Sequence, residues 1–217
     1  MKKMSGFIFI LSAFLFCAVT SFSQSEADYL VIYSDTDSGS ELKGYQTPGG
    51  VTVIKAKYRI AYTDNFYKMA IVVRDDGELI AIDRNENIIL YPFVYNNGPD
   101  YVYEGLFRFV ENDKIGFANL NGDKIIPAVF DFAEPFSEGL AGYAMGGKKE
   151  FVHGDERWFW TDADENGYIN KSGQRFSKIV KTENDERHAW TKDRKHYLLD
   201  DKGFILKEIF DPLPEPE

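Results

Sequence analysis

The chain has 217 residues, of which 16% are aromatic and 28% are charged, and its formal net charge is −10 at neutral pH. This length suits one domain with a substantial core. The acidic balance argues against nucleic acid and anionic membrane surfaces as partners, because both carry negative charge. We therefore expect a globular protein with a well-solvated surface that binds no nucleic acid.

The N-terminus has the pattern of a secretory signal peptide over residues 1–23. Lys2 and Lys3 precede an apolar run over residues 6–19, and small residues follow before a cleavage site after residue 23. The run is shorter than the roughly 18 apolar residues of a membrane anchor, so we expect no membrane span after signal removal. Cleavage would remove Cys17, the only cysteine, and would change the net charge to −12. The sequence thus predicts export, to the periplasm or outside the cell, without a disulfide.

The stretch over residues 116–143 predicts a small β unit. Asn121-Gly122 is a strong hairpin signal, for which we expect a type I′ turn, because both residue types tolerate positive φ. A second turn is predicted over residues 135–139 and a further strand over residues 140–145. Such a unit contains about three short strands, which are too few to bury a face alone.

Copies of this unit recur along the chain. Gly50 and Gly122 take the same place in matching segments, and a period of about 36 residues predicts an intermediate turn at Glu86. Asn85 and Asn87 flank that position, as a turn requires. Further turns are predicted at Gly173 and Gly203.

These copies define the predicted organisation. A lead-in covers residues 24–43, a β-repeat domain covers residues 44–211, and a disordered acidic tail covers residues 212–217. The third unit carries a polar insertion over residues 147–162. The successive units are predicted over residues 44–79, 80–115, 116–165, 166–195 and 196–211.

The predicted fold class is all-β. Periods near 36 residues also suit helical repeats, but the glycine turns and the β-branched and aromatic runs favour strands. We expect tandem hairpin or meander repeats of about 36 residues. They would stack as an open array or as a propeller-like assembly, and the spacing leaves both arrangements open.

Residues 116–143 resemble the bacterial WG-repeat family. The matching features are the Gly-aromatic start, Ile126-Pro127, Phe130-Asp131 and the segment Phe-Ser-Glu-Gly-Leu-Ala over residues 136–141. Ile115 stands where the family has its tryptophan. The resemblance implies tandem β repeats in a protein that is often exported, and it implies no general catalytic residues.

A calcium site is the one cofactor hypothesis that the sequence raises. Asp162, Asp164, Asn166 and Gly167 follow the first positions of an EF-hand loop, but Gly173 stands where a bidentate glutamate is needed. We therefore expect a plain acidic loop and no cofactor, with calcium binding as the alternative.

Catalytic signatures are missing from the sequence. His153, His188 and His196 lack metal-ligand spacing, and we expect His153 and His188 to be surface residues in charged loops. There is no nucleophile elbow and no phosphate-binding loop. We expect a protein that is not an enzyme. The alternative is an envelope protein that binds or hydrolyses glycans, with hydrolysis requiring two carboxylates roughly 5–10 Å apart.

The hypothesis of a binding function rests on the aromatic residues. Trp158, Phe159 and Trp160 lie in the insertion, where strand alternation would put both tryptophans on one face and Phe159 on the other. We expect most aromatics of the second unit to fill the core, namely Tyr91, Phe93, Tyr95, Tyr101 and Tyr103. The sequence thus predicts a non-catalytic, exported binding module whose partner is an unidentified envelope protein or glycan.

Overall fold

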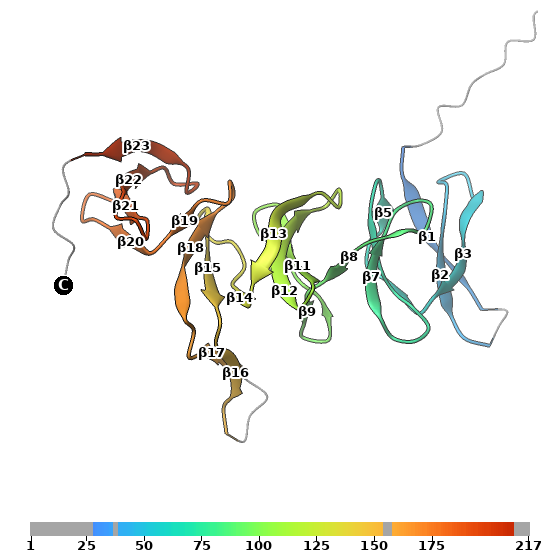
Figure 1. The fold of residues 1–217 in the computed structure, drawn as a ribbon. Coiled ribbons are helices and arrows are strands. Elements are labelled where there is room, and N and C mark those ends of the chain that lie inside the picture. Colours follow the sequence, from blue (N-terminus) through green and yellow to red (C-terminus); the bar gives the residue numbers. More distant parts are fainter. Residues whose placement is uncertain (1–27, 37–38, 154–157, 211–217) are drawn as a thin grey trace, which may run out of the picture.

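A computed structural model describes residues 28–36, 39–153 and 158–210 (Figure 1). These residues form strands, turns and loops without a helix, which confirms the all-β prediction. Hence no helix in the described segments is long and apolar enough to cross a membrane. The predicted signal peptide and the predicted tail over residues 212–217 lie outside the described residues and stay predictions.

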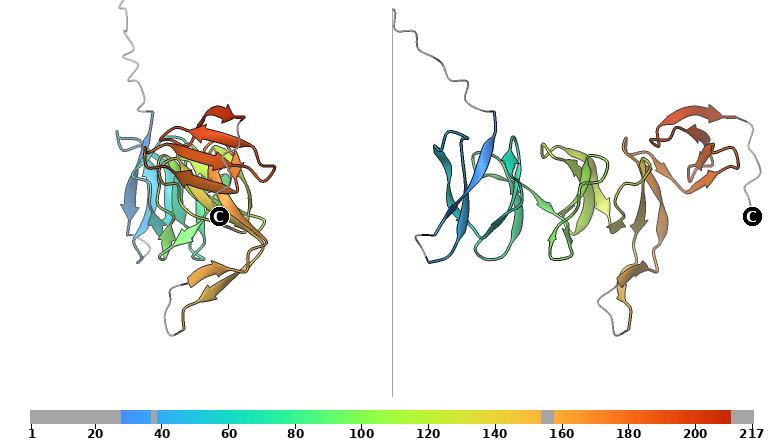
Figure 2. Two further views of the ribbon diagram at one scale, coloured as in Figure 1. Left: turned by 90° about the vertical axis from the view of Figure 1, so that its left-hand side faces the viewer. Right: turned by 180° about the vertical axis from the view of Figure 1, so that it is seen from behind.

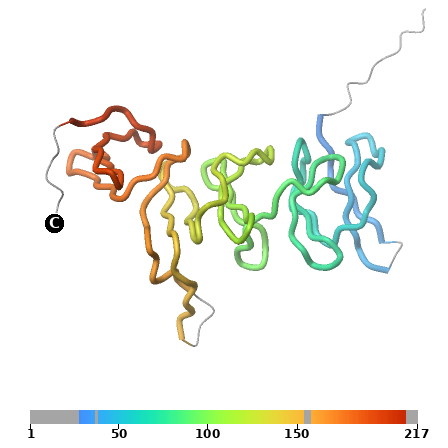
Figure 3. The backbone as a smooth tube through the Cα atoms, viewed as in Figure 1, coloured from blue at the N-terminus to red at the C-terminus, as the bar shows by residue number. Residues whose placement is uncertain are grey.

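The chain forms a row of small antiparallel units that runs from one end of the molecule to the other (Figures 1 and 2). The first unit consists of β1 (Leu30–Asp35), β2 (Leu42–Gln46) and β3 (Thr52–Tyr58). Strand β1 lies in the predicted lead-in and pairs along its length with β2. The first and last units occupy opposite ends of the row, so the units form an open array and not a ring (Figure 3).

The later units repeat the same meander. The second contains β6 (Ala70–Val73), β7 (Leu79–Ile82) and β8 (Ile88–Pro92). The third contains β11 (Leu106–Glu111), β12 (Lys114–Asn119) and β13 (Lys124–Phe130). The fourth contains β15 (Leu140–Met145), β18 (Glu165–Asn170) and β19 (Arg175–Phe176). The fifth contains β21 (Arg187–Trp190), β22 (His196–Leu199) and β23 (Ile205–Ile209).

Short strands join one unit to the next. They are β4 (Ile60–Ala61), β5 (Asn65–Phe66), β14 (Phe132–Ala133) and β20 (Lys178–Lys181). Strand β4 pairs with β6, β14 with β15, and β20 with β21, so the second, fourth and fifth meanders each gain a strand from the connection before them. Strand β8 also pairs with β11, which merges the second and third units into a seven-stranded sheet. These joints let neighbouring units share buried faces that a single meander could not cover.

Two further hairpins stand outside this pattern. One consists of β9 (Val94–Tyr95) and β10 (Gly98–Pro99), between the second and third units. The other consists of β16 (Lys148–Phe151) and β17 (Trp158–Thr161), within the predicted insertion of residues 147–162. In Figure 1 the β16–β17 hairpin projects away from the row.

The repeated turns share one backbone geometry. Gly50, Glu86, Gly122, Gly173 and Gly203 all have positive φ, between 65° and 87°. Each of their N–H groups donates to the carbonyl oxygen three residues earlier. The intermediate turn that the period placed at Glu86 is therefore present, although a glutamate occupies the position that glycine holds in the other copies.

The turn type differs from the expected type I′. Asn121 does not have positive φ, and the turn is a type I turn closed by Gly122 in the left-handed region. The Oδ1 atom of Asn119 accepts the N–H groups of Asn121 and Asp123, which stabilises this form. Type I′ geometry occurs instead at Glu138-Gly139, where both residues have positive φ.

Candidate functional site

The β16–β17 hairpin carries the predicted aromatic residues. The ring of Trp160 stacks on Phe132 at a centroid distance of 5.7 Å, and the ring of Trp158 meets the same phenylalanine edge-on at 5.6 Å. The Nε1–H of Trp160 donates to the Gly146 carbonyl at 2.8 Å. Both tryptophans therefore share one face of the hairpin and hold it against the joint between the third and fourth units. Phe159 is about half exposed.

A second group of aromatic residues comes from the β9–β10 hairpin and the segment after it. Tyr101 packs edge-on against Tyr95 at 6.0 Å and against Tyr103 at 6.3 Å. All three side chains are more than 40% exposed, as is Tyr91. The expectation that most aromatics of the second unit fill the core is therefore wrong. Strand alternation could not reveal the exposure of Tyr95, Tyr101 and Tyr103, because the segment leaves the sheet after β8 and forms a separate hairpin, whereas Tyr91 lies on the exposed side of β8.

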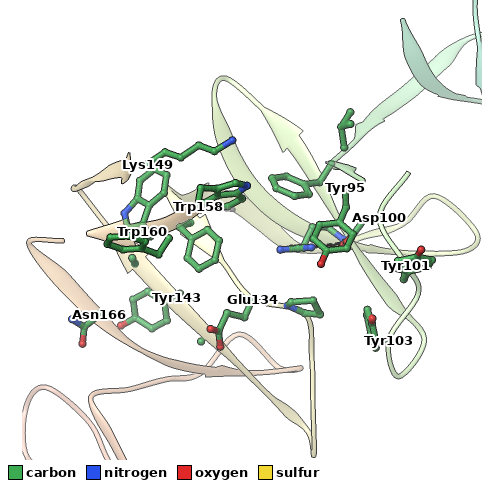
Figure 4. A pocket seen from close by; sticks show the side chains of 18 of the residues that line it. Tyr95, Asp100, Tyr101, Tyr103, Glu134, Tyr143, Lys149, Trp158, Trp160 and Asn166 are labelled. Carbon is green, nitrogen blue, oxygen red and sulfur yellow. Dashed lines mark hydrogen bonds and ion pairs between the residues drawn. The ribbon is translucent and has the colours of Figure 1, made fainter. Parts of the chain in front are cut away.

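These two hairpins enclose an open cleft of about 1240 Å³, with the joint between the third and fourth units as its floor (Figure 4). Its lining includes amides and no Leu, Ile or Met. The aromatic lining consists of Phe93, Tyr95, Tyr101, Tyr103, Phe132, Tyr143, Trp158, Phe159, Trp160 and Tyr168. The amides belong to Asn96, Asn97 and Asn166.

A buried ion pair stabilises the floor of this cleft. Arg108 donates from Nε and Nη2 to the two carboxylate oxygens of Asp100, at 2.8 and 2.6 Å, and both side chains are at most 5% exposed. Nη1 of Arg108 donates to the Ala133 carbonyl, and the guanidinium lies 4.4 Å from the centre of the Phe93 ring. Asp100 also accepts the backbone N–H of Arg108. The pair fixes the segment after β10 onto β11, and sequence analysis missed it because no local pattern links the two residues.

Two other charged groups reach the cleft. Glu134 is exposed, and within the described residues it forms no ion pair. Its carboxylate lies against Gly142, where a Cβ atom would stand 2.6 Å from its Oε2, so the glycine makes room for it. The ammonium group of Lys149 lies 4.4 Å from the centre of the Trp158 ring, a cation–π distance.

Residues 115–148 match the family described as WG containing repeat. The chain contains a WG repeat. A search of curated proteins gave no match to the chain. The WG repeat spans β12 to β15 and ends where β16 begins, so it supplies the floor of the cleft through Phe132, Glu134 and Tyr143. Most of the two hairpins that wall the cleft lies outside the match.

The candidate calcium ligands lie just after the β16–β17 hairpin. Asp162 pairs with Lys148 at 3.0 Å, and that hydrogen bond lowers the pKa of the Asp162 carboxyl. Asn166 lies in the extended strand β18, opposite Ala144. An EF-hand needs a continuous loop of about twelve residues. Here strand β18 begins at Glu165, so the loop is interrupted after Asp164. In the described segments no cluster of three or more His, Cys, Asp or Glu residues has metal-site geometry.

Two of the histidines form a buried pair in the fifth unit. His188 Nδ1 lies 2.8 Å from His196 Nε2, and the His196 ring stacks on Trp190 at 4.4 Å. Both histidines are more than 90% buried. The expectation that His188 is a surface residue is wrong, because residues 187–190 form the inner strand β21 and not a charged loop. His153 is exposed.

Proposed function

We propose that the chain is a non-catalytic binding module whose ligand lies in the aromatic cleft. The observation that carries this proposal is the pair of hairpins that face each other across the joint between two units. Each hairpin is an addition to the meander, and each presents rings to the open cleft between them (Figure 4). Exposed aromatic side chains on a firmly paired scaffold are typical of binding surfaces, because they offer a large contact area at low entropic cost.

The charges of the cleft favour binding over glycan hydrolysis. A glycosidase needs two carboxyl groups that are both available to the substrate. The cleft lining contains two, Asp100 and Glu134. The Asp100 carboxylate is engaged by the guanidinium and backbone N–H of Arg108, so Glu134 is the one that reaches the cleft without such a partner.

The proposed setting is the cell envelope or the outside of the cell. The signal-peptide pattern over residues 1–23 supports export, and the net charge of −10 supports partners other than nucleic acid. The proposed partner is an envelope protein or glycan. Its chemistry must suit a cleft of rings, amides and few free charges.

A capture experiment from cell-envelope extract tests this function. The bait is residues 24–217, compared with Tyr101→Ala, which removes an exposed ring of the cleft. Tyr67→Ala is the matched control, because Tyr67 is similarly exposed and lies outside the cleft. A Trp158→Ala/Trp160→Ala variant, checked by circular dichroism, removes the opposite wall.

We expect a defined protein or glycan to be captured by the native bait and by the Tyr67 variant. We expect the Tyr101 variant and the double tryptophan variant to lose it. Identical capture by all four baits would contradict a role for the cleft in binding.

A further inference from the structure

The aromatic cleft continues into a second hollow along the row. This second hollow has a volume of about 1060 Å³ and reaches back to Arg59, Ile60 and Tyr62 near β4. The two hollows share the segment of residues 93–97 together with Lys149 and Trp158. The two hollows therefore adjoin at these residues, and together they extend from the second unit to the fourth; we call the adjoining hollows the groove.

The size of this groove points to a chain-like ligand. Pockets for single small molecules typically have volumes of about 300–1,000 Å³. Each hollow alone, at about 1240 and 1060 Å³, exceeds that range. Both are open to the side, so a ligand can extend through them without being enclosed.

The charges along the groove balance, although the whole chain is acidic. The Asp100–Arg108 pair is neutral as a unit. The remaining charged side chains of the lining are two positive ones, Arg59 and Lys149, and two negative ones, Glu78 and Glu134. A groove without net charge gives no electrostatic preference to a polyanion or a polycation.

The lining chemistry favours sugar rings over peptide side chains. The apolar C–H face of a sugar ring packs flat against an aromatic ring, while its hydroxyl groups need amide and carboxylate partners. The cleft supplies both kinds of group, with exposed rings beside Asn96, Asn97, Asn166 and Glu134. The aromatic cleft has no Leu, Ile or Met side chain of the kind that forms pockets for aliphatic side chains of a peptide, whereas the second hollow adds Ile60 and Leu79 at the end of the groove near β4.

We propose that this groove binds an uncharged polysaccharide, whose chain lies across the second, third and fourth units. The inference rests on the proposed function, since it names the ligand class of the same cleft. Trp158 has a central position because it lines both hollows. Tyr62 and Tyr168 lie in different hollows, toward the two ends of the groove.

Affinity electrophoresis of residues 24–217 tests this ligand class. Native gels contain a soluble neutral polysaccharide (a β-glucan, a xylan or a galactomannan), or a charged one (polygalacturonate or glycol chitosan). At least one neutral polysaccharide should retard the protein, and retardation should persist from low salt to about 0.5 M salt because no net charge is involved. Trp158→Ala should weaken binding at least tenfold and Trp158→Phe should restore much of it.

Two further measurements test whether the ligand occupies both hollows of the groove or contacts only the surroundings of Trp158. Tyr62→Ala, in the second hollow, should weaken binding of the polysaccharide, whereas Tyr67→Ala outside the groove should not. By calorimetry, the affinity for oligosaccharides of the retarding polymer should rise with length, until the oligosaccharide spans both hollows. An affinity that is constant from the shortest oligosaccharide would overturn the continuous groove.

The outcomes distinguish this inference from the function on which it rests. If no neutral polysaccharide retards the protein, or if only a charged one does so in a salt-sensitive way, the ligand class is wrong. In that case, capture of an envelope protein that depends on Tyr101 would leave the proposed function in place. If neither retardation nor cleft-dependent capture is seen, both proposals fail.

Discussion

The ring of Phe109 lies over Gly116 on the neighbouring strand, so closely that a Cβ atom on Gly116 would stand 2.7 Å from the Phe109 Cε1 atom. The two residues are direct cross-strand partners of β11 and β12. The same contact joins Tyr33 to Gly44 in the first unit, again at 2.7 Å. The repeated glycine therefore makes room for an aromatic ring from the strand before it.

In the fifth unit the two strands exchange roles, because the aromatic residue lies on the later strand β22 and the small residue on the earlier strand β21. Tyr197 stands six residues before the turn residue Gly203, which is where Gly116 stands relative to Gly122. Its cross-strand partner is Ala189. One large and one small residue therefore face each other in both arrangements.

Substitution of the repeat glycine should destabilise the fold. In Gly116→Ala the new Cβ would stand 2.6 Å from the Ile126 carbonyl oxygen and 2.7 Å from the Ala128 nitrogen, and backbone atoms cannot move aside cheaply. We expect a loss of about 1–3 kcal/mol in the free energy of unfolding, measured by urea denaturation. Gly49→Ala is the control, because its nearest atom is 3.7 Å away and its φ is not positive. Equal stability of both variants would contradict the close packing.

Breaking the buried ion pair beneath the cleft should cost more. Asp100→Asn leaves the Arg108 guanidinium buried without a carboxylate, and removal of one partner from such a pair typically costs about 3–5 kcal/mol. The comparison is Asp76→Asn at the exposed Arg74–Asp76 pair, where we expect no measurable loss. Thermal and urea unfolding of both variants measure the difference. A stable Asp100→Asn variant would show that the pair does not fix the cleft floor.

One carboxylate bridges the third and fourth units. Glu104 accepts the Gly139 N–H at 3.1 Å and pairs with Lys171 at 2.7 Å. Burial alone would raise the pKa of the Glu104 carboxyl, but the Lys171 hydrogen bond and the backbone N–H groups together lower it. Glu104→Ala should therefore cost about 1–2 kcal/mol, with the partial exposure of the site keeping the figure low.

Hydrogen exchange provides the measurement for this joint. Amides of residues 137–142 should exchange faster in Glu104→Ala than in the native chain, because their contact with the preceding unit is lost. Glu111→Ala is the control, since Glu111 pairs with Lys124 on the surface and its variant should leave those amides unchanged. Acceleration confined to the immediate surroundings of residue 104 would contradict a role in joining the units.

The buried histidine pair should make the fifth unit sensitive to acid. Burial, together with the neighbouring His188, lowers the pKa of His196. The unfolded chain then binds a proton more readily than the folded chain, so the stabilisation is complete above the unfolded pKa of about 6.5 and is lost as the pH falls. A second proton on the pair would also set two N–H groups face to face across 2.8 Å.

Thermal unfolding between pH 7.5 and pH 5.5 measures this effect. The ordinary pKa values of Asp and Glu side chains, about 4, lie below this interval, so we expect the histidines to dominate the change. The melting temperature should fall on acidification in the native chain and fall less in His196→Phe, which keeps a ring against Trp190. The exposed His153→Gln should behave like the native chain. A His196→Phe variant with the full native pH dependence would contradict the assignment to this pair.

Local features were predictable because they depend on neighbouring residues. The period of about 36 residues placed a turn at Glu86, and the backbone there has the same positive φ as at the glycine turns. The turn type at Asn121-Gly122 was predicted wrongly. The Asn119 side chain accepts two N–H groups within the loop and stabilises a type I turn, a competition that the Asn-Gly signal alone does not reveal.

The sequence by itself determined that the chain consists of β repeats, where the repeats turn, and which segment interrupts them, because φ preferences and strand alternation act over a few residues. Only the tertiary structure decided that the row is open and that the hairpins of Tyr95 and Trp158 face one cleft. That arrangement depends on how successive units are placed against one another. Contacts between them, such as β14 with β15 and Phe132 with Trp160, set this placement, and they join positions that no local pattern connects.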